Sequence, residues 1–261
     1  MVQPKYALIT GAASGIGAEI TRTLYHEGYN IIAVDLNRPE YLNDLYTVGQ
    51  SNLFVNIDLS NPQQCQSLVG YITGEYGPVD GFGPIDVLVN NAGFQHVSPL
   101  EEFPESTWGD MLQVMLTAPF LLTKAVLPVM KERRYGRIIN IGSIHSQVAS
   151  LNKAGYITAK HGLVGLTKAT ALEAGPYQIT ANVICPSYVR TPLVEEQIAD
   201  QAETLGISTE EVESEVFLKA SATGKMIEPS EVASMVSFLC SENAKSITGS
   251  CWTVDGGWTA Q

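Results

Sequence analysis

Basic residues are scarce in this chain of 261 residues. It holds 15 Lys and Arg against 27 Asp and Glu, and its formal net charge is −12. Surfaces that bind nucleic acid need clustered Lys and Arg, so this balance argues against a nucleic-acid partner. The acidity alone names no partner, because a net charge far from zero mainly keeps a protein soluble.

Cysteine is also scarce, and long apolar runs are missing. The four cysteines show no C-x-x-C or other metal-ligand spacing, so we expect no metal site. Scattered thiols of this kind are typical of buried cysteines in a reducing compartment. We see neither a signal-peptide layout nor an apolar run close to the roughly 20 residues that cross a bilayer. We therefore expect a cytoplasmic protein with no membrane partner.

Short apolar runs alternate with helical patterns along the chain. Continuous apolar strands with helices between them predict one large α/β domain, whose parallel sheet is covered on both faces. Pro119 and Pro128 lie inside one helical pattern, and we expect them to kink or shorten it. The predicted strands are 6–10, 31–35, 53–57, 87–90, 137–143, 180–185 and 251–254. The predicted helices are 15–28, 62–76, 105–133, 156–175, 195–219 and 230–241.

Two segments interrupt this alternation. Gly-Pro-Val-Asp at 77–80 recurs as Gly-Pro-Ile-Asp at 83–86. The repeat lies at the amino end of a predicted strand, away from the edge where such sheets bind ligands, so we interpret it as a surface insertion. Residues 195–215 contain eight acidic and no basic side chains. That composition is typical of a solvated helical face, and it also suits a lid whose acids point outward.

A glycine pattern, G-x-x-x-G-x-G at residues 11–17, follows the first predicted strand and opens the first predicted helix. Glycines there allow a tight turn and a close approach of the backbone to a pyrophosphate. The helix amino terminus adds free N–H groups and partial positive charge. The same glycines could also form an ordinary strand-to-helix turn, but the order of strand, turn and helix favours a dinucleotide site.

Asp35 ends the second predicted strand, eighteen residues after Gly17. A carboxylate in this place can bind both ribose hydroxyls of adenosine, and it would repel the extra phosphate of NADP. Ala13 offers no positive charge to such a phosphate, whereas Arg38 is a nearby cation that could bind it and so favours NADP. We predict NAD as the cofactor.

Tyr156 and Lys160 are four residues apart in a predicted helix, so their side chains share one face. A free tyrosine has a pKa of about 10, which is too high for a good base at neutral pH. We expect the ammonium and the helix amino terminus to lower it. Ser143, which ends the fifth predicted strand, can donate a hydrogen bond to the same substrate oxygen. Together they predict a general acid–base, a charge that tunes it and an orienting hydroxyl.

With these motifs the sequence resembles the short-chain dehydrogenase/reductase family. The matching pieces are T-G-A-A-S-G-I-G at 10–17, N-N-A-G at 90–93, Ser143, Tyr156, Lys160 and Pro186. The resemblance implies a doubly wound Rossmann-type domain with seven parallel strands in the order 3-2-1-4-5-6-7, and a homotetramer. It implies that Tyr156 exchanges the proton and Lys160 also holds the nicotinamide ribose. The cofactor residues that we predict are Gly11, Ser14, Gly15, Ile16, Gly17, Asp35, Asp58, Leu59, Asn91, Tyr156, Lys160, Pro186, Val189 and Thr191.

A closer resemblance, to bacterial D-3-hydroxybutyrate dehydrogenases, lies in segments 91–96, 160–162, 189–197 and 255–261. It implies a substrate carboxylate surrounded by Lys153, which supplies charge, and by side chains that supply directional donors. Such a clamp would fix the hydroxyl at Tyr156, under a helical lid at about 190–220. The substrate residues that we predict are Gln95, His145, Lys153, Tyr188, Gln197 and Trp258.

The chain departs from these relatives at two positions near the site. Met115 stands where most relatives have an Asn that links the catalytic Lys to a water chain, and a thioether cannot donate a hydrogen bond. The proton relay must differ, for example by using backbone carbonyls and water. Tyr188 stands where the hydroxybutyrate enzymes usually have Trp. Because Tyr is smaller and adds a hydroxyl, the apolar wall could admit a different side chain.

Three functions therefore stay open at this stage. The leading hypothesis is an NAD-dependent oxidoreductase that interconverts (R)-3-hydroxybutyrate and acetoacetate, with a small anionic hydroxy or keto acid as its partner. The second is a related enzyme for another hydroxy acid, a cyclic ketone or an acyl thioester, which Tyr188 motivates. The third is a weakly catalytic NAD-binding module, which Met115 motivates and the intact Tyr156 and Lys160 oppose.

Overall fold

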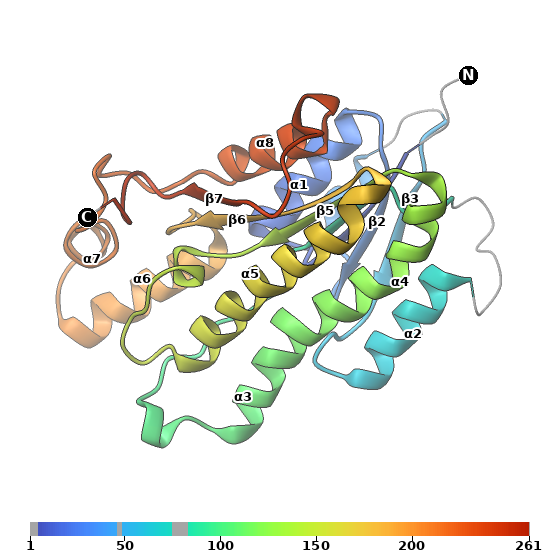
Figure 1. The fold of residues 1–261 in the computed structure, drawn as a ribbon. Helices are drawn as coiled ribbons and strands as arrows, with labels where there is room; N and C mark the ends of the chain where they lie inside the picture. Colours follow the sequence, from blue (N-terminus) through green and yellow to red (C-terminus); the bar gives the residue numbers. More distant parts are fainter. Residues whose placement is uncertain (1–4, 46–48, 75–82, 261) are drawn as a thin grey trace.

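A seven-stranded parallel sheet forms the centre of the molecule, in a computed structural model that describes residues 5–45, 49–74 and 83–260 (Figure 1). Its strand order, β3-β2-β1-β4-β5-β6-β7, confirms the predicted Rossmann-type α/β fold. All five residues of the first strand are buried, as expected for a sheet covered on both faces. The strands are Tyr6–Thr10 (β1), Asn30–Asp35 (β2), Asn52–Asn56 (β3), Val87–Asn90 (β4), Gly136–Ile141 (β5), Ile179–Pro186 (β6) and Cys251–Val254 (β7).

Two hydrophobic cores fill the spaces between the sheet and its helices. On one face of the sheet lie α1 and α8, and on the other lie α2, α4 and α5 (Figure 1). The parallel connections place the carboxyl ends of the strands at one edge, where the loops that follow β1, β4, β5 and β6 meet. The helices are Gly15–His26 (α1), Pro62–Thr73 (α2), Glu105–Leu112 (α3), Ala118–Arg133 (α4), Ala154–Ala174 (α5), Pro192–Leu205 (α6), Thr209–Val212 (α7) and Pro229–Cys240 (α8).

The helix predicted at 105–133 is not shortened by its prolines. Instead, α3 continues through a π turn, Gln113–Thr117, into α4. The N–H of Ala118 donates to the carbonyl of Gln113, five residues back, and Pro119 follows in the first turn of α4. Because proline has no N–H, the carbonyl of Met115, four residues before Pro119, has no α-helical donor. The π turn is thus how the chain accommodates Pro119, while Pro128 lies within α4.

By length and composition, the stretch Glu105–Arg133 is apolar enough to cross a membrane, which the sequence analysis missed. It is the one such helix in the described part of the chain. In the fold it packs against the sheet, where Met111, Met115 and Leu122 are fully buried in the core that also holds β4 and β5. Its apolar character therefore belongs to a core helix.

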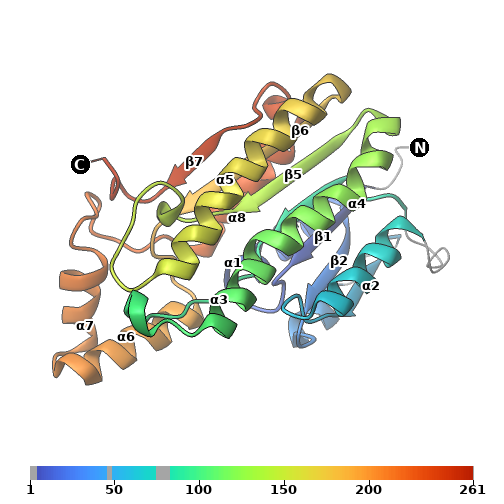
Figure 2. The same cartoon turned by 60° about the horizontal axis from the view of Figure 1, so that its bottom comes forward.

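The acidic segment forms two helices where one was predicted at 195–219. Gly206, with a positive φ of 66°, ends α6, because glycine adopts this left-handed conformation without strain. Ser208 and Glu211 then form a capping box that starts α7, and a π turn, Glu213–Phe217, completes the segment. We call residues 192–217 the α6–α7 unit; it lies at one side of the molecule (Figure 2). Its buried side chains form a small core of Ile198, Val212 and Phe217 together with Met226.

The predicted repeat is only partly within the described residues, since 77–80 lies outside them. Its second copy ends at Asp86, which is almost fully buried. The Asp86 carboxylate accepts a hydrogen bond from the N–H of Tyr6 at 2.8 Å and forms an ion pair with Arg133 at 2.8 Å. This end of the repeat therefore joins β1 to the end of α4.

Candidate active site

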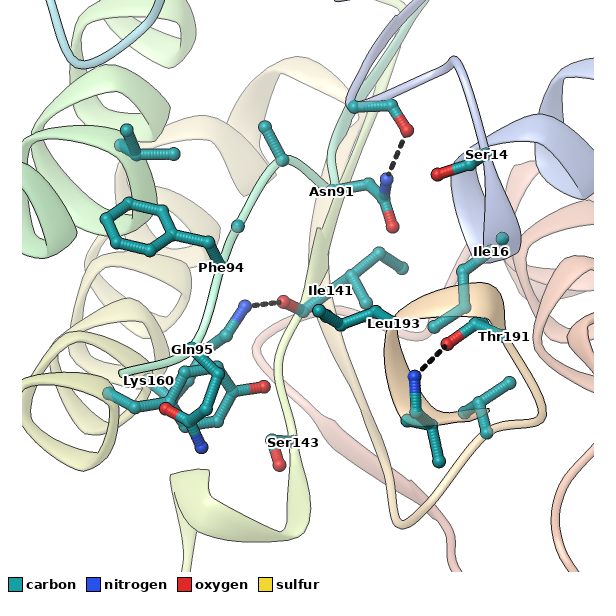
Figure 3. Close-up of a pocket in the computed structure, with 18 of the residues that line it drawn as sticks. Ser14, Ile16, Asn91, Phe94, Gln95, Ile141, Ser143, Lys160, Thr191 and Leu193 are labelled. Carbon is teal, nitrogen blue, oxygen red and sulfur yellow. Dashed lines mark hydrogen bonds between the residues drawn. The ribbon is translucent and has the colours of Figure 1, made fainter. Parts of the chain in front are cut away.

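A cavity of about 620 Å³ opens at the carboxyl edge of the sheet. Its walls come mainly from the loops after strands β1 to β6 and from α6, and this edge is where doubly wound sheets bind ligands. Figure 3 shows two sides: Gln95, Ser143 and Lys160 lie together on one, and Ser14, Ile16 and Thr191 on the other. From the predicted set, the cavity brings together Gly11, Ser14, Gly15, Ile16, Asp35, Asp58, Leu59, Asn91, Gln95, Ser143, His145, Lys153, Tyr156, Lys160, Pro186, Tyr188, Val189, Thr191 and Gln197.

Two predicted residues lie outside this lining. Gly17 packs behind the glycine turn, where an added Cβ would come within 1.9 Å of the Gly11 carbonyl oxygen, so it shapes the turn without facing the cavity. Trp258 lies in the turn after β7, where its backbone N–H donates to the carbonyl of Asp255 at 3.1 Å. The substrate role of Trp258 stays a prediction.

The glycine turn has the features of an anion site. Gly11 and Gly15 have positive φ angles of 65° and 51°, and a Cβ on Gly11 would come within 2.8 Å of Ala92 and Asn91. Ser14 precedes α1 without capping it, and the first turn of α1 contains no acid. The backbone N–H groups in the first turn of α1 are therefore available for a phosphate, and a dinucleotide fits these residues.

Asp35 is fixed at the end of β2. One carboxylate oxygen accepts from the N–H of Ala13 at 2.8 Å and the other from the N–H of Leu36 at 2.7 Å. Arg38, the cation that could favour NADP, does not line the cavity. Its guanidinium donates to Asn43 at 3.4 Å and lies 5.9 Å from the centre of the Phe54 ring. This part of the cavity lining therefore contains the Asp35 carboxylate and lacks the Arg38 guanidinium.

Ser143 lies two residues beyond β5, whereas the sequence placed it at the strand end. It caps the short helical turn Ile144–Ser146: its Oγ accepts from the N–H of His145 at 3.2 Å, and its own N–H donates to Oγ of Ser146 at 3.1 Å. This capping box fixes the backbone on which both Ser143 and His145 enter the cavity. Tyr156 enters from the first turn of α5.

Lys160 is almost fully buried behind Tyr156. Its Nζ donates to the carbonyl of Ile141 at 2.7 Å (Figure 3) and lies 5.5 Å from the centre of the Tyr156 ring. Burial lowers the pKa of Lys160 to about 8, so it is mostly protonated at neutral pH. Its ammonium can also bind a ribose hydroxyl.

The expected lowering of the Tyr156 pKa is wrong for this structure. Burial raises the pKa of Tyr156, and a hydrogen bond with Ser143 offsets this only in part. The physical reason is desolvation of the phenolate by burial, which the sequence could not reveal. Tyr156 is thus a protonated hydroxyl at neutral pH, suited to donate a proton to a carbonyl oxygen.

Unpartnered polar groups gather at the other end of the cavity. Both ring nitrogens of His145 and Oε1 of Gln95 are buried with no hydrogen-bond partner among the described residues. Burial and the charge of Lys153 lower the pKa of His145 to about 4, so the imidazole is neutral and has one donor. Lys153 therefore supplies the positive charge, while burial lowers its pKa from the usual value. Buried groups of this kind need a polar ligand.

The α6–α7 unit also reaches this end. Gln197 lines the cavity from α6. The ring of Tyr188 packs edge-on against Phe217 with centroids 4.4 Å apart, and Nζ of Lys153 lies 5.7 Å from the centre of the Tyr188 ring. Tyr188 thus stands between the charged side chain and the core of the α6–α7 unit.

Several lining residues were missed by the sequence analysis, among them Phe94, Asp110 and Val114. Two of them could have been found from the sequence, because Phe94 directly follows the N-N-A-G segment and Val114 directly precedes Met115. No motif in the sequence marked Asp110. Met115 itself lies behind Gly93, close to Lys160. A Cβ on Gly93 would lie 3.1 Å from its Sδ and 3.8 Å from Nζ of Lys160.

Comparison with known sequences agrees with this geometry. A family model described as "Enoyl-(Acyl carrier protein) reductase" matches residues 11–259. D-beta-hydroxybutyrate dehydrogenase of Rhizobium meliloti is 43% identical over 262 residues, covering 98% of this chain and 99% of that protein. The chain belongs to the short-chain dehydrogenase/reductase family. It is accordingly an NAD(P)-dependent oxidoreductase.

Other members of the short-chain dehydrogenase/reductase family are similarly close. The enzyme of the same name from Cupriavidus necator is 39% identical over 264 residues, and an uncharacterized oxidoreductase of Bacillus subtilis, YxjF, is 41% identical over 264 residues; both matches cover 100% of each chain. Among solved structures, 4-hydroxyisoleucine dehydrogenase complexed with NADH superposes with a TM-score of 0.85 at 30% identity, covering 98% of this chain and 99% of that one.

Proposed function

We propose that the protein is an NAD-dependent dehydrogenase that interconverts (R)-3-hydroxybutyrate and acetoacetate. The observation that carries this proposal is the cluster of Lys153, His145 and Gln95, which lines the same cavity as Tyr156 and Ser143. One positive charge beside neutral donors suits one small carboxylate. Two relatives that match over the full length of the chain are D-beta-hydroxybutyrate dehydrogenases.

Each residue has a role that follows from its place. Lys153, His145, Gln95 and Gln197 would hold the carboxylate, so that the carbon at position three meets Tyr156. Tyr156 gives its proton to the carbonyl oxygen in reduction. In oxidation its ionised form, the tyrosinate, accepts the proton of the substrate hydroxyl, and the Ser143 hydroxyl orients the oxygen in both directions. The bound dinucleotide supplies or accepts the hydride. Positioning a small acid in this way removes most of the orientational cost of the reaction.

The proposed cofactor is NAD. The Asp35 carboxylate stands at the end of β2 in the lining of the cavity, whereas Arg38 does not line it. A phosphate on the adenosine ribose would meet this negative charge. The glycine turn would hold the pyrophosphate, and Lys160 and Tyr156 would bind the nicotinamide ribose. A structural neighbour was solved with NADH, which is consistent with this choice.

A second candidate is hydride transfer on a different substrate, which would be oxidation of another hydroxy acid or reduction of a cyclic ketone or an acyl thioester. The observation that favours it is Tyr188, which forms part of the apolar wall beside Lys153. A structural neighbour acts, by its name, on 4-hydroxyisoleucine, a larger acid. A third candidate, a weakly catalytic NAD-binding module, rests on Met115 beside Lys160.

We also propose that residues 1–261 form a single domain with a lid at about 190–220, and that the enzyme is a cytoplasmic homotetramer that binds neither nucleic acid nor membranes. Support for assembly comes from apolar side chains that remain exposed on α4 and α5, Phe120, Val129 and Leu172. Exposed apolar groups on neighbouring helices are typical of subunit interfaces.

One panel of substrates distinguishes the candidates. The protein is incubated with NAD or NADP and with (R)- or (S)-3-hydroxybutyrate, a longer hydroxy acid, a secondary alcohol or a sugar alcohol, and NAD(P)H absorbance is recorded. Turnover of (R)-3-hydroxybutyrate with NAD is the expected result. Faster turnover of the longer acid or of an uncharged alcohol would establish the second candidate, and NAD binding without turnover the third.

A further inference from the structure

The chain segments that precede and follow the α6–α7 unit lie side by side. Val189 and Ile227 form an isolated parallel bridge. The N–H of Arg190 donates to the carbonyl of Ile227 at 2.9 Å, and the N–H of Ile227 donates to the carbonyl of Tyr188 at 3.0 Å. The two ends of the segment are thus joined to each other directly beside Tyr188 and Val189, which line the cavity.

The unit has a core of its own, apart from the two that pack on the sheet. Ile198 of α6 is buried with Val212 of α7 and Phe217 of the π turn. Glu213 lies in that turn, between Val212 and Phe217. Because interiors are close-packed, a shift of Glu213 is passed through this core to α6. Gln197, the neighbour of Ile198, is the polar side chain that α6 adds to the described lining of the cavity, beside the apolar Pro192, Leu193 and Val194.

Arg190 links this unit to the body of the protein. Its guanidinium pairs with Glu213 at 2.8 Å and lies 3.7 Å from Glu228, the residue that precedes α8. Arg190 itself is held by its backbone hydrogen bond to Ile227. One of its two acidic partners therefore belongs to the α6–α7 unit, and the other directly precedes α8, with Arg190 between them.

We infer that the Arg190–Glu213 ion pair positions Gln197. The ion pair holds the α6–α7 unit in the orientation in which Gln197 completes the substrate clamp. The inference rests on the proposed function, in which Gln197 binds the substrate carboxylate. Neither Arg190 nor Glu213 touches the reacting atoms, since neither lines the cavity. Their effect passes through the small core to α6.

A double-mutant cycle tests this coupling. Glu213→Gln should raise KM for (R)-3-hydroxybutyrate by about three- to fivefold, the size expected for a half-exposed ion pair, with KM for NAD unchanged. In a Gln197→Ala background, the same substitution should add nothing, because the positioned side chain is gone. The matched control is Glu215→Gln, which removes the same charge from an exposed side chain in the same turn; it should leave KM unchanged.

A second measurement does not depend on the substrate. Hydrogen–deuterium exchange in α6 should be faster in Glu213→Gln than in the native protein or in Glu215→Gln. Equal exchange in all three, or a KM effect of Glu213→Gln that persists in full without Gln197, would overturn the inference. If the native enzyme does not turn over (R)-3-hydroxybutyrate, the proposed function fails. The exchange experiment alone then decides whether the ion pair holds α6 in place.

Discussion

Lys153 is the residue on which the choice of an acidic substrate depends. Partial burial lowers its pKa, and a carboxylate would compensate this charge. We predict that Lys153→Ala raises KM for the carboxylate substrate by about 10- to 100-fold, the loss expected for a charge-assisted hydrogen bond. KM for NAD should change little. Steady-state kinetics with each substrate varied in turn provides the measurement.

The control for this variant is Lys168→Ala, because Lys168 is an exposed lysine on the same helix that does not line the cavity. It should leave both KM values unchanged. An unaltered KM for the acid in Lys153→Ala would remove Lys153 from the clamp.

His145 makes stability depend on pH in the acid range. Its pKa falls from 6.5 to about 4 on folding because of burial. Between these values the unfolded chain binds a proton that the folded protein does not, so stability is lost as pH falls. We predict that the free energy of unfolding decreases by about 1.4 kcal/mol per pH unit from this group, and that His145→Gln removes that slope.

Urea unfolding at several pH values between 4 and 6.5 measures this effect. His26→Gln serves as the control, because His26 is exposed at the end of α1, and it should retain the native slope. A slope in His145→Gln equal to that of the native protein would show that His145 is not the buried group responsible.

At the scale of the element, the π turn before α4 sets the surroundings of Lys160. Met115 lies in this turn, and its carbonyl has no α-helical donor because Pro119 follows. We expect the backbone carbonyls of this turn, with water, to carry the proton path that an Asn side chain would otherwise support. Met115→Asn should then alter kcat by less than about threefold and leave its pH profile in place.

The pH–rate profiles of the native enzyme and of Met115→Asn are the measurement. A much faster Met115→Asn variant, or a shifted profile, would show that the thioether limits proton transfer. Met115→Leu is the matched control, because it keeps the apolar volume and the backbone, and it should behave like the native enzyme.

The helices and strands differ in how well they could be predicted from the sequence. Strand positions were predicted because parallel strands buried on both faces are continuous apolar runs. The π turn was missed, since it depends on the hydrogen-bond register around Pro119 and leaves no periodic signal. The break in the acidic segment was missed although Gly206 and Ser208 marked it. Among site residues, positions near motifs were found, while the pKa of Tyr156 depends on burial that only the tertiary structure shows.

At the scale of the whole molecule, the net charge of −12 opposes the approach of an anion. The α6–α7 unit, whose helix α6 lines the cavity, carries eight of the acidic residues. Salt screens such a field, since the Debye length falls from about 30 Å at 0.01 M to about 8 Å at 0.15 M. We predict that kcat/KM for the acid rises about two- to threefold over this range.

An uncharged secondary alcohol, assayed alongside, controls for effects of salt on the enzyme itself, and its kcat/KM should stay constant. A fall in kcat/KM for the acid would mean that attraction by Lys153 outweighs repulsion by the rest of the molecule.

The central claim is that this cavity selects a small carboxylate for hydride transfer at Tyr156. The measurement that tests it most directly is the ratio of kcat/KM for (R)-3-hydroxybutyrate to that for butan-2-ol, which keeps the secondary alcohol and lacks the carboxylate. Charge-assisted hydrogen bonds from the clamp predict a ratio of about a hundred or more with NAD. A ratio near one, or no turnover of the acid, would contradict the account.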